Sequence, residues 1–388
     1  MCCKMIKGFK CKNIYMENGC TDGILLLENG KFLKVLPYDY NLKEDNNNYD
    51  ILDLEERLII PGIIDIHNHG FKGNSVCGEF KKPSKDELKK YLVSLATVGV
   101  TGVTPAASLE YFDFIADLNE EKYEGARILG IYSEGPFSTR SGENSSENVE
   151  YIEPSLKVAK EYIAKARGNL KIMSLAPEAN NSEEVIKYLV EQGIIVAAYH
   201  TNANYEEMTK GFKDGITLVT HLGNVMRGIH HRDVGALGAA LLDENMDCEI
   251  ITDFYHLCPE MLKLMFKVKD YSKFILISDS MVLSGAEPGT YTIFGNYDLI
   301  VDENGYVKDK TGRLCGSSKY VLYGIKNIVE ELKVPMEKAL EMASLNPAKK
   351  LGIDHRKGSI AIGKDADFVV IDKSYKCIAT YIEGKKAY

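Results

Sequence analysis

The sequence predicts an α/β protein built on a (β/α)8 barrel, the TIM barrel, with a small β-sandwich formed by both chain ends. Between residues 59 and 357, eight short apolar runs alternate with amphipathic helical stretches. Strands that are apolar on both faces and alternate with helices are typical of a parallel sheet. Eight such units in this length favour a closed barrel. The chain ends instead show short alternating segments with turn signals, which favour antiparallel strands.

The eight apolar runs have the composition of buried strands. In chain order they are 59–66, 100–104, 126–132, 170–176, 194–199, 217–220, 248–252 and 274–278. Helical patterns follow most of them, for example at 84–99, 181–193 and 204–215, and Ser84 with Glu87 forms a capping-box pattern at the first. An open doubly wound sheet would need a glycine-rich first turn for a nucleotide, which "PGIIDIHNHG" at 61–70 is not.

Both chain ends are expected to pair in the small domain. Residues 1–58 contain a turn signal at Asn29-Gly30, and residues 358–388 contain one at Glu383-Gly384. We therefore predict a β-sandwich domain from 1–58 plus 358–388 and a catalytic barrel from 59–357. An insertion with β-like alternation, near 285–313, separates the eighth run from its helix.

Composition excludes several classes of protein. The chain has 388 residues, of which 45% are hydrophobic and 27% charged, as in ordinary globular proteins. Its net charge of −9 argues against a nucleic-acid surface, and no apolar run approaches the roughly 18 residues of a membrane span. The N-terminus has no signal-peptide pattern, and nine cysteines without a CxxC pair fit free thiols. We therefore expect a cytoplasmic protein.

Histidine and carboxylate side chains fall at or just beyond the ends of six runs. They are His67, His69, Glu134, His200, His221, Asp253, His256 and Asp279. Any one of them would more often be an ordinary hydrogen-bonded loop residue. The active sites of such barrels lie at the C-terminal ends of the strands. Six runs that all end in such residues therefore favour one shared site. The remaining histidines are expected to be surface or loop residues, and these are His230, His231 and His355.

Imidazole and carboxylate together form a ligand set for zinc or a similar divalent cation. Glu134, His200 and His221 would leave an open position for water, as catalytic metal sites do. His67 and His69 would point the same way from an extended chain and could hold a second ion, with Glu134 bridging. The sequence therefore predicts one or two ions, with zinc expected and iron, manganese or cobalt as alternatives.

Ten segments along the chain carry a family resemblance. They are "PGIIDIHNHG", "SEGPF", "LAPE", "HTNANYEEMTKGFKDGITLVTHLGNVM", "RDVGALGAAL", "DFYH", "ISDSM", "CGSS", "MASLNPAKKLG" and "GSIAIGKDADFVVID". Through them nearly the whole chain resembles the amidohydrolase superfamily and, within it, the N-acetylglucosamine-6-phosphate deacetylase family. The His-x-His motif and the last segment occur across the superfamily, whereas the stretch 200–241 is much more specific to the deacetylases.

The resemblance implies a role for individual residues. Asp279 would be the catalytic acid/base, and Arg232 would bind the substrate phosphate across a homodimer interface. The metal ligands that it implies are Glu134, His200 and His221, with His67 and His69 as the extra pair found in some members. The substrate-binding residues that it implies are Asn224, Val225, Arg232, His256, Leu314, Cys315 and Gly316. Glu143 and Asn144 are the nearest match to a further substrate motif of the family.

Three departures from the family pattern are expected at the substrate rim. The usual Lys-Gly-x-His after the Glu-Gly-Pro segment is missing, and Asn144 stands in the histidine's place. Tyr132 stands where histidine is common, and Ser280 where alanine is common. The resemblance thus predicts metal-dependent deacetylation of N-acetylglucosamine-6-phosphate.

Three alternatives stay open at this point. The substrate could be N-acetylgalactosamine-6-phosphate or a cyclic amide. The fourth run ends in "SLAPE" without the lysine that many cyclic-amide hydrolases carry, and Arg232 with Asn224 favours a phosphorylated sugar. The third alternative, a non-catalytic metal-binding relative, should have lost a ligand or the aspartate, and all of these are present.

Overall fold

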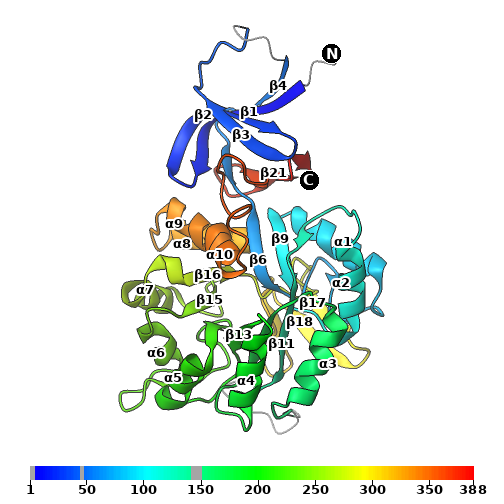
Figure 1. Cartoon of the computed structure of the whole chain (residues 1–388), viewed down its shortest axis with the longest axis vertical. Coiled ribbons are helices and arrows are strands. Elements are labelled where there is room, and N and C mark those ends of the chain that lie inside the picture. The colour runs from blue at the N-terminus through cyan, green and yellow to red at the C-terminus, as the bar shows by residue number, and fades with distance from the viewer. Residues whose placement is uncertain (1–4, 44–47, 141–150) are drawn as a thin grey trace.

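The computed structural model describes residues 5–43, 48–140 and 151–388. Figure 1 shows a body of central strands with helices around them, and a β-sheet at one end of the molecule where the two chain ends meet. None of the helices within the described ranges is long and apolar enough to cross a membrane.

The two chain ends form one sheet, with the order β22-β21-β20-β5-β1-β2-β3 and β4 paired to β1. Its strands are β1 (Met5–Met16), β2 (Gly19–Glu28), β3 (Lys31–Leu36), β4 (Asn48–Asp53), β5 (Leu58–Pro61), β20 (Phe368–Ile371), β21 (Cys377–Ile382) and β22 (Lys385–Lys386). The two halves join where β5 pairs antiparallel with β20. The expected turns at 29–30 and 383–384 separate β2 from β3 and β21 from β22.

The central strands form two parallel sheets in chain order. β6 (Ile63–Asn68), β9 (Val100–Pro105) and β10 (Arg127–Ile128) form the first. The second contains β11 (Ile131–Phe137), β12 (Leu170–Leu175), β13 (Ile195–Ala198), β14 (Ile216–Val219), β15 (Asp247–Ile251) and β16 (Phe274–Ile277). Single parallel bridges connect the two sheets on both sides, from Ala106 to Tyr132 and from Asn68 to Ser280.

Helices follow the strands and lie on the outside of the body (Figure 1). They are α1 (Lys85–Ala96), α2 (Phe112–Asn119), α3 (Leu156–Ala166), α4 (Ser182–Glu191), α5 (Tyr205–Asp214), α6 (Gly235–Leu242), α7 (Pro259–Val268), α8 (Val321–Glu330), α9 (Met336–Leu340) and α10 (Asn346–Lys350). Ser84 caps α1 by accepting a hydrogen bond from the Glu87 amide, and Asn204 with Glu207 forms a complete capping box on α5. The three helices predicted by pattern are therefore present within a few residues of their expected bounds.

Two of the eight predicted runs are each divided between two strands. The run 59–66 breaks at Gly62, so that β5 joins the terminal sheet and β6 begins the parallel strands. A Cβ at Gly62 would lie 2.3 Å from Oγ1 of Thr101, and glycine is what lets the chain pass this closely. The run 126–132 breaks between β10 and β11, and β11 continues to Phe137. Glu134 was expected at the end of its strand, but it lies within β11.

The segment between β16 and α8 forms a three-stranded antiparallel sheet of β17 (Gly289–Ile293), β18 (Tyr297–Val301) and β19 (Val307–Asp309). Its apolar side chains pack against the chain that follows β16, in a cluster containing Met281, Leu283, Ile293, Leu299 and Val307. This sheet lies within the predicted insertion, and it supplies side chains to the site described below.

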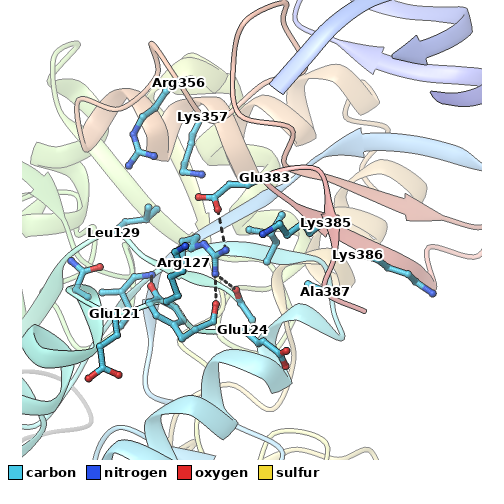
Figure 2. Close-up of a pocket in the computed structure, with 16 residues that line it drawn as sticks. Glu121, Glu124, Arg127, Leu129, Arg356, Lys357, Glu383, Lys385, Lys386 and Ala387 are labelled. Carbon is cyan, nitrogen blue, oxygen red and sulfur yellow. Dashed lines mark hydrogen bonds and ion pairs between the residues drawn. The ribbon is translucent and has the colours of Figure 1, made fainter. Parts of the chain in front are cut away.

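The terminal sheet contacts the parallel strands through an ion pair. Arg127 of β10 donates a hydrogen bond from Nη2 to Oε2 of Glu383 at 3.0 Å, and from Nη1 to the carbonyl of Tyr123 at 2.9 Å. Figure 2 shows Arg127 and Glu383 facing each other at a cavity of about 630 Å³. The buried ammonium of Lys357 pairs nearby with Asp367 at 2.6 Å. An ion pair and a buried charge pair thus lie at the junction of the terminal sheet with the parallel strands.

Candidate active site

Two clusters of histidine and carboxylate side chains lie where the parallel strands end. One contains Glu134, His200 and His221, and the other contains His67, His69 and Asp279. In each cluster, one nitrogen or oxygen atom per residue lies within 4.8 Å of the others. Imidazole nitrogen and carboxylate oxygen at this spacing fit a divalent ion of the zinc type. The first grouping agrees with the ligands predicted from the sequence, whereas Asp279 was predicted as the acid/base and not as a member of the second cluster.

The carboxylate of Glu134 lies between the two clusters. Its Oε1 atom is 3.2 Å from Nε2 of His221 and 3.5 Å from Nε2 of His67. Its Oε2 atom is 3.1 Å from Nε2 of His69. The two oxygens of Glu134 therefore face histidines of both clusters.

Asp279 is held beside the histidine pair by its backbone and its side chain. Its amide donates to the carbonyl of His67 at 3.0 Å, and its carbonyl accepts from the amide of Ser317 at 2.8 Å. Its Oδ1 atom lies 3.3 Å from Nε2 of His69 and 3.6 Å from Nε2 of His67. A carboxylate in this position can exchange protons with a group bound between the clusters.

A buried polar network fixes β6 and β16 to each other just below the site. Asp65 accepts hydrogen bonds at Oδ2 from Oγ of Ser278 at 2.5 Å and from Nδ2 of Asn68 at 3.0 Å. These residues flank His67 in β6 and Asp279 after β16. The network therefore sets the relative position of the histidine pair and the aspartate.

Backbone strain gathers at the same strand ends. His200, His221 and Asp279 have φ angles of 35°, 28° and 46°, in the left-handed region that side chains other than glycine rarely adopt. Each such residue costs about 1–3 kcal/mol, and the surrounding structure must impose the conformation. Strain of this kind is typical of functional sites, because it aims side chains that relaxed backbone would not aim.

The charges of the site shift the pKa values of its groups in opposite directions. Burial alone would lower the pKa of His67, but the carboxylates of Glu134, Glu249 and Asp279 raise it to about 10. Burial and the neighbouring His221 lower the pKa of His200 to about 3. Burial would raise the pKa of Glu134, but His67 and His221 hold it well below its usual range. Glu134 and His67 thus shift in the directions that favour the charged form of each.

A cavity of about 520 Å³ opens above the clusters, and most of the predicted substrate residues line it. These are Asn224, Val225, His256, Leu314, Cys315 and Gly316. The His256 ring is held by a hydrogen bond between Nδ1 and Oδ2 of Asp253 at 2.8 Å, and the same oxygen accepts from Ser317 at 2.9 Å. The structure thus brings these residues to the metal-ligand candidates.

One predicted substrate residue that the structure describes does not line this cavity. Arg232 is exposed and lines a separate surface pocket beside Tyr205 and Arg227. Glu143 and Asn144 lie outside the described residues. Arg232 therefore does not reach the cavity of its own chain in this structure.

Two of the expected rim departures are packing residues instead. Tyr132 is fully buried, and its hydroxyl makes a hydrogen bond with Oγ1 of Thr220 at 2.7 Å. Ser280 is also fully buried, and its hydroxyl donates to the carbonyl of Gly70 at 2.7 Å. Neither residue lines the cavity. Their expected position at the substrate rim was wrong, because Tyr132 near the start of β11 and Ser280 just after β16 both point into the core.

Sequence reasoning missed the side chains that the insertion and the interior supply. Phe294, Tyr297 and Arg313 line the cavity from the segment around β17–β19, and Arg313 is the one arginine or lysine among its described lining residues. Such long-range placement leaves no local signal. Glu249 was missed although it lies within the apolar run 248–252, where a charged residue is itself a signal. It is fully buried and contacts His67.

Comparison with known proteins places the chain in a family. The sequence model of the Amidohydrolase family matches residues 58–387. The chain belongs to the amidohydrolase family. This amidohydrolase is 32% identical to the N-acetylglucosamine-6-phosphate deacetylase of Vibrio furnissii, over 93% of its own length and 89% of that protein. It is 30% identical to the N-acetylgalactosamine-6-phosphate deacetylase of Escherichia coli O157:H7, over 87% of its own length and 89% of that protein.

A solved structure gives the same picture of the amidohydrolase fold. The N-acetylglucosamine-6-phosphate deacetylase of Pasteurella multocida superposes with a TM-score of 0.87 at 25% identity, covering 98% of this chain and 99% of that one. Membership of the amidohydrolase family implies a divalent metal, and the two clusters supply candidate ligands for it. The resemblance inferred from sequence motifs is thereby confirmed.

Proposed function

We propose that this amidohydrolase removes the acetyl group from N-acetylglucosamine-6-phosphate, giving acetate and glucosamine-6-phosphate. One observation carries the proposal, which is the meeting of Glu134, His200, His221 and Asp279 beneath a cavity of substrate-sized volume. The names and coverage of the relatives support it, since several proteins called N-acetylglucosamine-6-phosphate deacetylase match over most of this chain. The enzyme is thus a hydrolase acting on a linear amide.

The metal ligands in this proposal are Glu134, His200 and His221 for one ion, with His67 and His69 holding a second. Zinc is the ion proposed, since nitrogen and carboxylate ligands with an open position are its usual catalytic set. When bound, such an ion lowers the pKa of water and polarises the amide carbonyl. The carboxylate of Glu134 would contribute to both ion positions, because Oε1 faces His221 and Oε2 faces His69.

Asp279 acts as the general base and then as the general acid. Its pKa is lowered by His67 and His69 against the effect of burial, so that its carboxylate is ready to accept a proton at neutral pH. It takes a proton from the attacking water and passes it to the amide nitrogen as the C–N bond breaks. The second transfer is required because an amide anion is a poor leaving group.

The sugar phosphate is bound by the residues that line the cavity. Asn224, Val225 and His256 contact the substrate, and Leu314, Cys315 and Gly316 form one wall. Arg232 from a second copy supplies the phosphate ligand, because its guanidinium matches two phosphate oxygens and its own chain leaves it exposed away from the cavity. This role of Arg232 requires that the enzyme be a homodimer.

The remaining expectations about architecture and location belong to the same proposal. The parallel strands close as a (β/α)8 barrel, which the bridges Ala106–Tyr132 and Asn68–Ser280 support. A sandwich domain of 1–58 plus 358–388 accompanies a barrel of 59–357 with its insertion near 285–313. The pairing of β5 with β1 and β20 supports a boundary at Gly62 instead of 58. Seven free cysteines in the described part of the chain support a cytoplasmic location.

N-acetylgalactosamine-6-phosphate is the second candidate substrate. The observation that favours it is the similarity to an N-acetylgalactosamine-6-phosphate deacetylase, at nearly the identity of the glucosamine relatives. The two sugars differ only in the direction of one hydroxyl, so the same metal site and Asp279 would serve both. A cyclic amide is disfavoured because β12 is followed by "APE" without a lysine.

The test is amine release from N-acetylglucosamine-6-phosphate, from its galactosamine epimer and from unphosphorylated N-acetylglucosamine, with metal content measured on the same sample. Faster turnover of the first substrate by metal-loaded enzyme is expected. Faster turnover of the epimer would select the second candidate. No turnover of any of the three by a metal-loaded sample would contradict the deacetylase assignment and favour a non-catalytic metal-binding relative.

A further inference from the structure

We propose that Glu249 is a positioning residue that fixes the ring of His67 as a metal ligand and thereby secures the second ion. The inference rests on the proposed function, in which His67 and His69 hold that ion. Glu249 lies in β15, on a strand that supplies none of the five proposed metal ligands. Its side chain points into the interior and is fully buried.

Glu249 contacts one residue from each of the two clusters, His67 and His221. Its Oε2 atom lies 3.0 Å from Nδ1 of His67. The same oxygen accepts a hydrogen bond from the backbone amide of His221 at 3.3 Å. On the other side of the imidazole, Nε2 of His67 faces Oε1 of Glu134 at 3.5 Å and Oδ1 of Asp279 at 3.6 Å. The ring is therefore held between Glu249 and the candidate metal position.

This arrangement determines which ring nitrogen of His67 can bind a metal. In the neutral imidazole one nitrogen carries a proton and the other carries a lone pair. The carboxylate of Glu249 accepts a hydrogen bond from Nδ1–H of His67, which keeps the ring proton on Nδ1 and directs the lone pair of Nε2 at the cluster. Carboxylate partners of this kind also make the imidazole a stronger ligand, and their loss typically weakens metal binding by about 10–100-fold.

Packing alone gives no reason for a glutamate at this position. Ile250 and Ile251 follow it in the same strand and are buried like it, so an aliphatic side chain would suit the strand. The Oε1 atom of Glu249 is buried and has no hydrogen-bond partner among the described residues. Burying a carboxylate with one unsatisfied oxygen is unfavourable. The contact with His67 accounts for its presence.

The two histidines of the pair differ in their support. Nδ1 of His67 has a carboxylate partner, whereas Nδ1 of His69 lies 3.4 Å from Sγ of Cys77, a weaker partner. His67 is fully buried, while the side chain of His69 is 20% exposed. Glu249 is thus the stronger of the two outer contacts that hold the pair.

The experiment compares full-length wild type with Glu249→Gln and with Ile250→Val, a matched control in the same strand. Metal-free protein is titrated with Zn²⁺, and bound ions per chain are counted by mass spectrometry; Co²⁺ absorption spectra report the geometry of each position. We expect Glu249→Gln to keep one ion at near wild-type affinity and to bind the second about 10–100-fold more weakly. Ile250→Val should bind both ions like wild type.

A double-mutant cycle keeps the inference testable if Glu249→Gln is also less stable. If Glu249 acts through His67, Glu249→Gln should cause no further loss of ion affinity in a His67→Ala background. A purely structural role would lower thermal stability equally in both backgrounds and leave the Co²⁺ spectrum of the second position unchanged. Glu249→Asp, which keeps the carboxylate, should restore part of the second-ion affinity.

Failure of this inference is distinguishable from failure of the proposed function. Two ions bound by Glu249→Gln with wild-type affinity, or only one ion in the wild type, would overturn the role of Glu249 and leave the deacetylase assignment intact. Absence of amide hydrolysis by wild type with both ions bound would overturn the assignment while leaving the ion count as the test of Glu249.

Discussion

Oδ1 of Asp279 lies 3.3 Å from Nε2 of His69. The proposed acid/base is therefore in direct contact with a proposed ligand of the second ion, and Oε2 of Glu134 lies 3.1 Å from the same nitrogen of His69. The group proposed for proton transfer thus contacts a group proposed for metal binding. A substitution of Asp279 tests the proton transfer and leaves all five proposed metal ligands in place.

Asp279→Asn is expected to bind metal and to lose turnover by about 10²–10⁴-fold, because general acid–base catalysis contributes that much. The amide keeps the size of the side chain but cannot accept the proton of water. The measurement is kcat for amine release, with ions per chain counted on the same sample. Asp302→Asn, in a turn of the insertion, is the matched control and should retain turnover. A kcat of Asp279→Asn close to that of wild type would show that another group carries the proton.

Arg232→Ala is expected to raise KM for the phosphorylated sugar and to leave the unphosphorylated sugar nearly unchanged, because only the former has the phosphate that the guanidinium binds. Steady-state kinetics on both substrates measure the difference. Equal losses on both would contradict the phosphate role.

Mixed dimers test whether Arg232 acts across an interface. When Arg232→Ala chains are mixed with Asp279→Asn chains, a site with its own Asp279 and the partner's intact arginine can form. Activity at low substrate concentration should therefore exceed the sum of the two separate variants. Strict additivity would place Arg232 within its own chain or outside the reaction.

Removal of the metal should abolish turnover and lower thermal stability. A ligand that binds only the folded state stabilises it, by about 2.7 kcal/mol at a free concentration 100 times Kd. Chelator-treated enzyme is therefore expected to have a lower Tm that rises again on addition of Zn²⁺ or Co²⁺, together with kcat. Full activity in a sample verified to be metal-free would exclude the proposed chemistry.

Metal affinity is expected to increase with pH. In the metal-free protein, carboxylates outweigh burial and raise the pKa of His67 to about 10, so His67 carries a proton at pH 7. A bound ion must displace this proton, and affinity for the second ion should rise by up to about tenfold per pH unit between pH 6 and 9. Calorimetry in two buffers of different ionisation enthalpy measures the released proton. Binding of the second ion without pH dependence or proton release would indicate that His67 is not its ligand.

The strand pattern could be predicted because each parallel strand is a separate apolar run with helical sequence after it. Six of the eight runs match single strands, whereas 59–66 and 126–132 are each divided between two. Apolar composition does not tell which sheet a buried residue joins, and so Ile59 and Ile64 look alike in sequence although they lie in different sheets. Only the tertiary path, with Gly62 against Thr101, separates them.

The candidate metal residues could be predicted because histidine and carboxylate are rare at buried strand ends, and several strands end at one place. The residues that line the substrate cavity were harder to predict from the sequence. Arg313 and Phe294 come from an insertion whose docking depends on tertiary packing. Tyr132 and Ser280 were expected at the rim, but their hydroxyls are satisfied in the interior. Local sequence does not reveal which way such side chains point.

The junction of β5 and β6 has a consequence for the synthesis of the chain. Pro61 pairs with Phe368 in the terminal sheet, and a few residues after Pro61 the same segment carries His67 and His69. The β20-facing edge of β5 therefore stays unpaired on the ribosome until residues 368–371 have been translated. Because contacts between distant parts of a sequence form slowly, assembly of the histidine pair should be among the late events of folding. A stop codon shortly before β20 would then leave every proposed ligand in the chain and remove the strand that anchors two of them.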